Sequence, residues 1–145
     1  MYQTMNLSHA EAQEMIAAVQ KKLEAEQKAA SIAVTDSHGE LIAFLRMDGC
    51  HLPPLTIAIN KAFTAARERR ESGAVGESSR TGPFPMTNYG DLRYVGWAGG
   101  FPVLYEGKVV GAIGISGLDE KLEGELGRMA VELVTRKQGR QGAQV

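Results

Sequence analysis

Two adjacent residues in this sequence, Cys50 and His51, have side chains that could bind a metal. Thiolate and imidazole are soft or borderline ligands for transition metals. Neighbouring side chains on an extended chain tend to point apart, so ordinary loop packing is the alternative. The other histidines, His9 and His38, have no HxxH or HExxH spacing with His51, which does not indicate a preformed zinc site. His51 is therefore the candidate metal ligand.

Three charged residues, Arg46, Asp48 and Lys61, form a second candidate site. Arg46 could clamp a carboxylate, and Lys61 or Asp48 could exchange protons with a small carboxylate or carbonyl compound. A salt-bridged rim at the edge of a sheet explains the same three residues without any catalysis. Both interpretations stay open at this stage.

The segment 97–117 carries glycines at regular intervals, but their spacing does not match a known phosphate-binding loop. Gly111, Gly114 and Gly117 recur every third residue, whereas a dinucleotide fingerprint needs GxGxxG. Ser116 and Gly117 precede a predicted helix, whose free amides could hold a carboxylate or propionate. The alternative is that these glycines only allow another backbone to approach closely.

Two hairpins and three amphipathic helices are predicted to position these residues. The first hairpin joins 31–36 to 40–47, and the second joins 103–105 to 109–115. Both return strands are apolar on both faces, so both are expected inside the sheet. The helices are expected to begin at Ser8 with a capping box, at the prolines that precede Leu55, and after Asp119. Asp119, Glu120 and Glu123 could hold a cation, or form a solvated first helical turn.

The connection 70–96 is rich in Gly, Ser and Pro and is longer than most loops. It is expected to be functional or to lie at a subunit interface, with at most a short helical turn near 76–80. Residues 138–145 are expected to form a frayed tail. The element order predicts an α+β fold, with an antiparallel sheet of about five strands and helices packed on it.

Bulk properties predict one domain of 145 residues with an ordered core over about 7–134. A net charge of −1 and a pI near 6.3 give no reason to expect a nucleic-acid partner. No apolar run approaches the roughly 18 residues of a membrane span, and the N-terminal residues do not resemble a signal peptide. A cytoplasmic location is expected, and the single cysteine excludes an intrachain disulfide.

Three ordered segments resemble the GlcG/HbpS-like haem-binding family, which includes the C-terminal domain of PduO-type proteins. They are Ile32-Ala33-Val34-Thr35-Asp36 with Gly39 and Leu41, running on to Arg46-Met47-Asp48-Gly49; Lys61-Ala62-Phe63-Thr64-Ala65; and Gly99-Gly100-Phe101-Pro102 with Gly107 and 111–117. The chain departs from the family pattern at Cys50-His51, where a small residue is usual, and at an aromatic, polar insertion over 88–94.

The resemblance implies a profilin-like sandwich, assembly into dimers or larger oligomers such as tetramers or octamers, and binding of haem or, alternatively, a corrinoid. It also implies a link to the breakdown of small two- and three-carbon compounds such as glycolate, diols and glycerol. The preferred interpretation is a binding module, with an enzyme acting through the three charged residues or a ligand-free structural oligomer as alternatives. The candidate ligand-binding residues are Cys50, His51, Thr64, Gly99, Gly100, Ser116 and Gly117. The axial donor to haem iron that the resemblance implies is His51 or, alternatively, the hydroxyl of Thr64.

An oligomer is also expected from the residues themselves. Two strands are apolar on both faces, while each of the three predicted helices presents one apolar stripe. Apolar surface left over in one subunit is usually buried against a symmetric copy.

Overall fold

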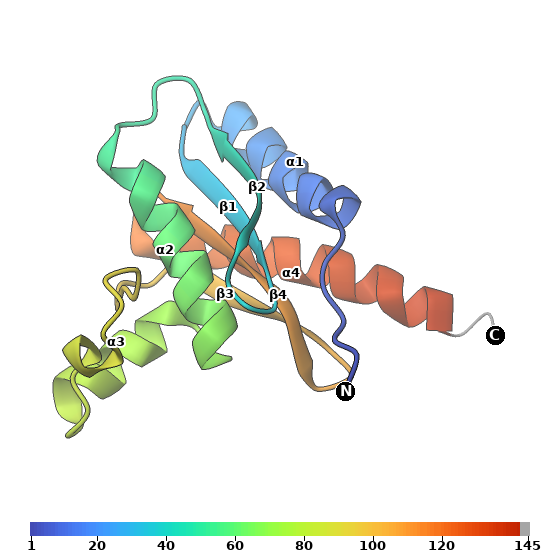
Figure 1. Ribbon diagram of the computed structural model, residues 1–145. Helices are drawn as coiled ribbons and strands as arrows, with labels where there is room; N and C mark the ends of the chain where they lie inside the picture. Colours follow the sequence, from blue (N-terminus) through green and yellow to red (C-terminus); the bar gives the residue numbers. More distant parts are fainter. Residues whose placement is uncertain (143–145) are drawn as a thin grey trace.

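The computed structural model describes residues 1–142, and within them a four-stranded sheet lies between two layers of helices (Figure 1). The strand order is β2-β1-β4-β3, and each neighbouring pair is antiparallel. The elements are α1 (His9–Ala25), β1 (Ser31–Asp36), β2 (Leu41–Arg46), α2 (Pro53–Glu68), α3 (Ser72–Thr81), a 3-10 helix η1 (Met86–Tyr89), β3 (Gly100–Tyr105), β4 (Lys108–Ser116) and α4 (Glu120–Gly142). The α+β class is confirmed.

One face of the sheet carries large apolar side chains and is covered by α1 and α4 (Figure 1). Ile32 and Val34 of β1 and Ile113 and Ile115 of β4 are fully buried in this layer. They meet the apolar stripes of the two helices, which themselves lie side by side. This layer is the main hydrophobic core.

The opposite face carries small side chains, and α2 packs closely against it. Ala33, Ala112 and Gly114 face the alanine stripe of α2, which includes Ala58 and Ala62. A Cβ atom at Gly114 would collide with the Ala58 carbonyl oxygen and lie 2.7 Å from the Ala62 nitrogen. The close-approach interpretation of this glycine is therefore the one that the structure supports.

The prediction of interior strands is right for one strand and wrong for the other. β4 lies between β1 and β3, and seven consecutive residues from Val110 to Ser116 are buried. β2 pairs only with β1 within residues 1–142, so 41–45 forms an edge strand. Its two apolar faces are explained by helices above and below it, not by a neighbouring strand. The sheet has four strands over residues 1–142, one fewer than the predicted five.

The connection 70–96 contains α3, a ten-residue helix that is longer than the predicted short turn. Its sequence has no apolar stripe, so periodicity does not reveal it. Contacts with the following segment hold it instead: Gly76 packs on the backbone of Gly96, and the Ser72 hydroxyl donates to the Trp97 carbonyl at 2.7 Å. Tertiary packing thus creates this helix.

Local signals at the other helix starts are confirmed. Ser8 and Glu11 form the capping box of α1, Pro53 begins α2, and Asp119 Oδ1 accepts from the Leu122 amide at 3.0 Å. α4 stays helical to Gly142, through most of the segment for which a frayed tail was expected, and 143–145 lie outside the described residues. Over residues 1–142 there is no helix with the length and apolarity that crossing a membrane requires.

Candidate functional site

Four of the candidate residues line one open groove beside the end of β2. We call it the Cys50–His51 groove; it measures about 500 Å³, within the range of small-molecule sites. One wall is the loop 48–51, with Asp48, Cys50 and His51, and the other walls are 27–29 and 117–119. His51 is exposed, so its imidazole is accessible from the groove. The Gly99-Gly100 turn is not among its lining residues.

The thiol of Cys50 lies on the side of this groove that faces the sheet. Its sulfur lies 3.4 Å from Ser31 Oγ, and a Cβ at Gly117 would lie 3.4 Å from it. Gly117 has a φ of 111°, which side chains rarely tolerate. The loop after β2 and the turn after β4 therefore lie next to each other. A residue larger than glycine at position 117 would be strained there.

The charges at this groove are mixed. Lys28 supplies a half-exposed cation that pairs with Glu26 at 3.4 Å, while Asp48 is exposed and Asp119 caps α4. The amides before α4, which the sequence offers as an anion site, are partly occupied: Leu118 donates to Glu123 Oε1 at 3.2 Å and Leu122 donates to Asp119. An anionic group in the groove would therefore compete with Glu26 for Lys28.

Lys61 lies in the interior, apart from Arg46 and Asp48, which are exposed. Its Nζ donates to Glu123 Oε2 at 2.8 Å and to the Ile115 carbonyl at 3.0 Å, and both side chains of the ion pair are about 5% exposed. The three charged candidates are thus not brought together in one groove. Glu123 is buried, although its place in the first turn of a helix suggests a solvated residue.

The Lys61–Glu123 pair joins the two helical layers past the end of the sheet. Lys61 comes from α2 and Glu123 from α4, which cover opposite faces, and they meet beneath Gly99. A Cβ at Gly99 would lie 2.7 Å from both Lys61 Nζ and Glu123 Oε2. Burial raises the pKa of the Glu123 carboxyl, and the hydrogen bond from Lys61 partly opposes that rise.

Thr64, Gly99, Gly100 and Ser116 are likewise interior positions. The Thr64 hydroxyl donates to the Asn60 carbonyl at 2.8 Å and accepts from the Val95 amide at 3.0 Å. Gly100 donates to Ser72 Oγ, and Ser116 is buried opposite Ser31. These residues belong to the protein interior and do not line the Cys50–His51 groove.

The insertion 88–94 packs on α2 beside Thr64, and Val95, which follows it, contacts the Thr64 hydroxyl. Tyr94 packs edge-on against Phe63 of α2 with ring centroids 5.0 Å apart, and Tyr89 stacks on Tyr94 at 4.2 Å. The Arg93 guanidinium lies over the Phe63 ring, 4.1 Å from its centroid. The segment is therefore a docked strap over α2.

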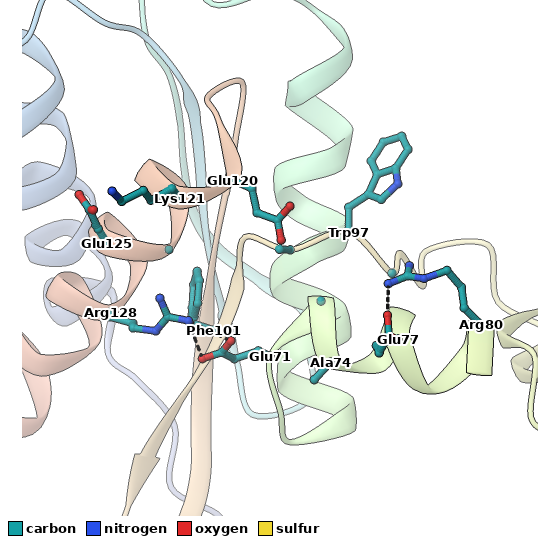
Figure 2. A pocket seen from close by; sticks show the side chains of 14 residues that line it. Glu71, Ala74, Glu77, Arg80, Trp97, Phe101, Glu120, Lys121, Glu125 and Arg128 are labelled. Carbon is teal, nitrogen blue, oxygen red and sulfur yellow. Dashed lines mark hydrogen bonds and ion pairs between the residues drawn. The ribbon is translucent and has the colours of Figure 1, made fainter. Parts of the chain in front are cut away.

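A second groove, of about 710 Å³, lies between α3 and the first half of α4 (Figure 2). We call it the α3–α4 groove. Its floor is made of small residues, and Figure 2 shows two ion pairs beside it, Arg128 with Glu71 and Arg80 with Glu77. Trp97 stands at its rim and is 63% exposed. Sequence reasoning missed this groove because three distant segments build it and no local motif marks any of them.

Comparisons with known proteins agree with the fold and give it relatives. A family model described as "Haem degrading protein HbpS-like" matches residues 7–132. Protein GlcG of Escherichia coli is 36% identical over 116 residues, 76% of this chain and 81% of that protein. The crystal structure of Klebsiella pneumoniae protein ORFY has a TM-score of 0.83 at 27% identity, covering 91% of this chain and 92% of that one. A crystal structure named as a PduOC–haem complex shares the fold, with a TM-score of 0.79 at 19% identity over 88% of this chain and 94% of that one.

Proposed function

Since the chain belongs to the HbpS-like family, we propose that it is a binding protein for haem or a related tetrapyrrole, held in the Cys50–His51 groove. The observation that carries this proposal is the exposed imidazole of His51 in a groove that also offers a thiol and a lysine. Porphyrin nitrogens supply the equatorial ligands of haem iron, so one axial side chain from the protein is sufficient.

Each groove residue has a distinct task in this proposal. The His51 imidazole would hold the iron, the Lys28 ammonium would pair with a propionate in place of Glu26, and the backbone at Gly117 would leave room for the macrocycle. Bound haem would supply an iron centre; the residues of this chain bind and orient it. A PduOC–haem complex with the same fold supports a tetrapyrrole on this scaffold.

Replacing His51 by alanine should shift or abolish the Soret band that haemin gives with the wild-type protein, because the axial nitrogen is lost. The control is His38→Ala, which removes an imidazole from the exposed β1–β2 turn, away from the groove. Absorption spectra of the three proteins with equimolar haemin test this. Identical spectra for wild type and His51→Ala would exclude His51 as the axial ligand.

The proposed setting is cytoplasmic, accessory to the breakdown of small two- or three-carbon compounds, which is what the family resemblance implies. The protein is proposed to act as an oligomer of at least two subunits. Its surface supports this: Leu92, Phe84, Leu52 and Leu41 are exposed by 100%, 78%, 68% and 47%. Exposed apolar residues beside a free strand edge favour association.

Size-exclusion chromatography with light scattering at micromolar protein should therefore give a mass of two or more subunits. Replacing Leu92 and Phe84 by serine should lower that mass if 82–96 lies in the interface, while Leu104→Ser on β3 serves as a control at another exposed position. A well-folded wild-type monomer would refute the oligomer.

A further inference from the structure

We propose that Glu123, held by Lys61, is a positioning residue for the ligand groove: the pair anchors the backbone on both sides of Ser116 and Gly117, and Gly117 lines the groove opposite Cys50. This inference rests on the proposed function, because it assigns the pair to the same groove. Neither Lys61 nor Glu123 lines that groove. Both act through the backbone that does.

The bracketing is read from three hydrogen bonds. On the strand side of the turn, Lys61 Nζ donates to the Ile115 carbonyl at 3.0 Å. On the helix side, the Leu118 amide donates to Glu123 Oε1 at 3.2 Å. Between the two, Lys61 Nζ and Glu123 Oε2 are joined at 2.8 Å. One buried ion pair therefore fixes the residues immediately before and after the Ser116-Gly117 turn.

Between these anchors, Ser116 is the last residue of β4 and pairs with Ser31, whereas Gly117 lies beyond the strand. Gly117 has a left-handed backbone with φ of 111°, and its nearest neighbours across the groove are the Cys50 sulfur and the ring of Pro54. Glycine permits this conformation but does not enforce it. A shift at Leu118 would move the groove wall relative to Cys50 and His51. The anchors thus determine the width of the site.

The carboxylate uses its two oxygens for different partners, and this makes a precise substitution available. Oε2 accepts from Lys61 and Oε1 accepts from Leu118. A glutamine has the same shape but only one acceptor oxygen, so it can satisfy one partner and presents an N–H donor to the other. Glu123→Gln should therefore release either the turn or the lysine while keeping the volume of the side chain.

The test compares haemin affinity in wild type, Glu123→Gln and two controls, all measured well below their melting temperatures. Glu125→Gln makes the same charge change at an exposed position of the same helix. Val134→Ala lowers stability by removing buried methyl groups at the far end of α4. Glu123→Gln should bind haemin about tenfold or more weakly, as is typical when an outer support of a metal site is lost. Its Leu118 amide should also exchange with solvent faster relative to the global rate.

Each outcome bears on a different claim. Unchanged haemin affinity and unchanged Leu118 exchange in Glu123→Gln would overturn the positioning role while leaving haem binding intact. Equal loss of affinity in Val134→Ala at matched stability would also overturn it, because the effect would then be one of stability alone. If wild type fails to bind haemin, the proposed function fails and the positioning role falls with it.

Discussion

Replacing Lys61 by methionine should lower the free energy of unfolding by about 3–5 kcal/mol at neutral pH, a large share of the roughly 5–15 kcal/mol typical of a domain. The cause is the carboxylate left behind: Glu123 is buried to the same extent as Lys61 and would lose its charged partner. Urea or thermal unfolding followed by circular dichroism measures the loss.

The loss in Lys61→Met should depend on pH. Burial raises the pKa of Glu123, and the lysine that opposes this rise is gone in the variant. A glutamate whose folded pKa lies above its unfolded value, about 4.3, adds stability below that value, and this stability is lost as pH rises through the folded pKa. The variant should therefore lose stability more steeply than wild type as the pH rises above the unfolded pKa of about 4.3.

The double variant Lys61→Met with Glu123→Leu is the matched control. It removes both charges, so it should recover to within about 2 kcal/mol of wild type, the remainder reflecting the Leu118 amide that loses its acceptor. A double variant less stable than Lys61→Met would mean that an unpaired Glu123 is not the cause of the loss.

Gly114→Ala should destabilise the protein by about 3 kcal/mol or more, because a single methyl group has no room between β4 and α2. The added carbon would collide with the Ala58 carbonyl and crowd the Ala62 amide. Both are backbone atoms of one helix, so relief requires the whole of α2 to move from the sheet. The melting temperature and the urea midpoint report the effect.

Gly139→Ala provides the contrast within the same chain. Gly139 lies in α4 with no atom within 4 Å of its added Cβ, so alanine should leave stability unchanged or raise it by up to about 1 kcal/mol. Similar results for the two substitutions would show that α2 does not need the close approach at Gly114.

The hairpins and three of the helices were predictable because their signals are local. The Asp36 turn, the Ser8 capping box and the continuous apolar run of β4 each lie within a few neighbouring residues. The position of β2 was not predictable from its pattern, since helices on both faces produce the same apolar strand at an edge as in the interior. α3 was missed because tertiary contacts replace an apolar stripe.

The assignment of the candidate site stays a prediction. The loop with Cys50 and His51 meets Gly117 at one groove, a neighbour that no spacing in the sequence indicates. The role of Lys61 was not readable, because its partner Glu123 lies 62 residues away and no spacing links them. Thr64 was a candidate oxygen donor in the sequence. In the folded chain its hydroxyl is covered and accepts from the Val95 amide, which the sequence alone does not show.

Titration of the purified protein with haemin, followed by absorption at the Soret band, tests the central claim most directly. Binding in the Cys50–His51 groove predicts a saturable shift that ends at one haem per subunit and is weakened in His51→Ala. Cobalamin in a parallel titration distinguishes a corrinoid from haem. The absence of any saturable change with haemin at stoichiometric concentrations would contradict the account.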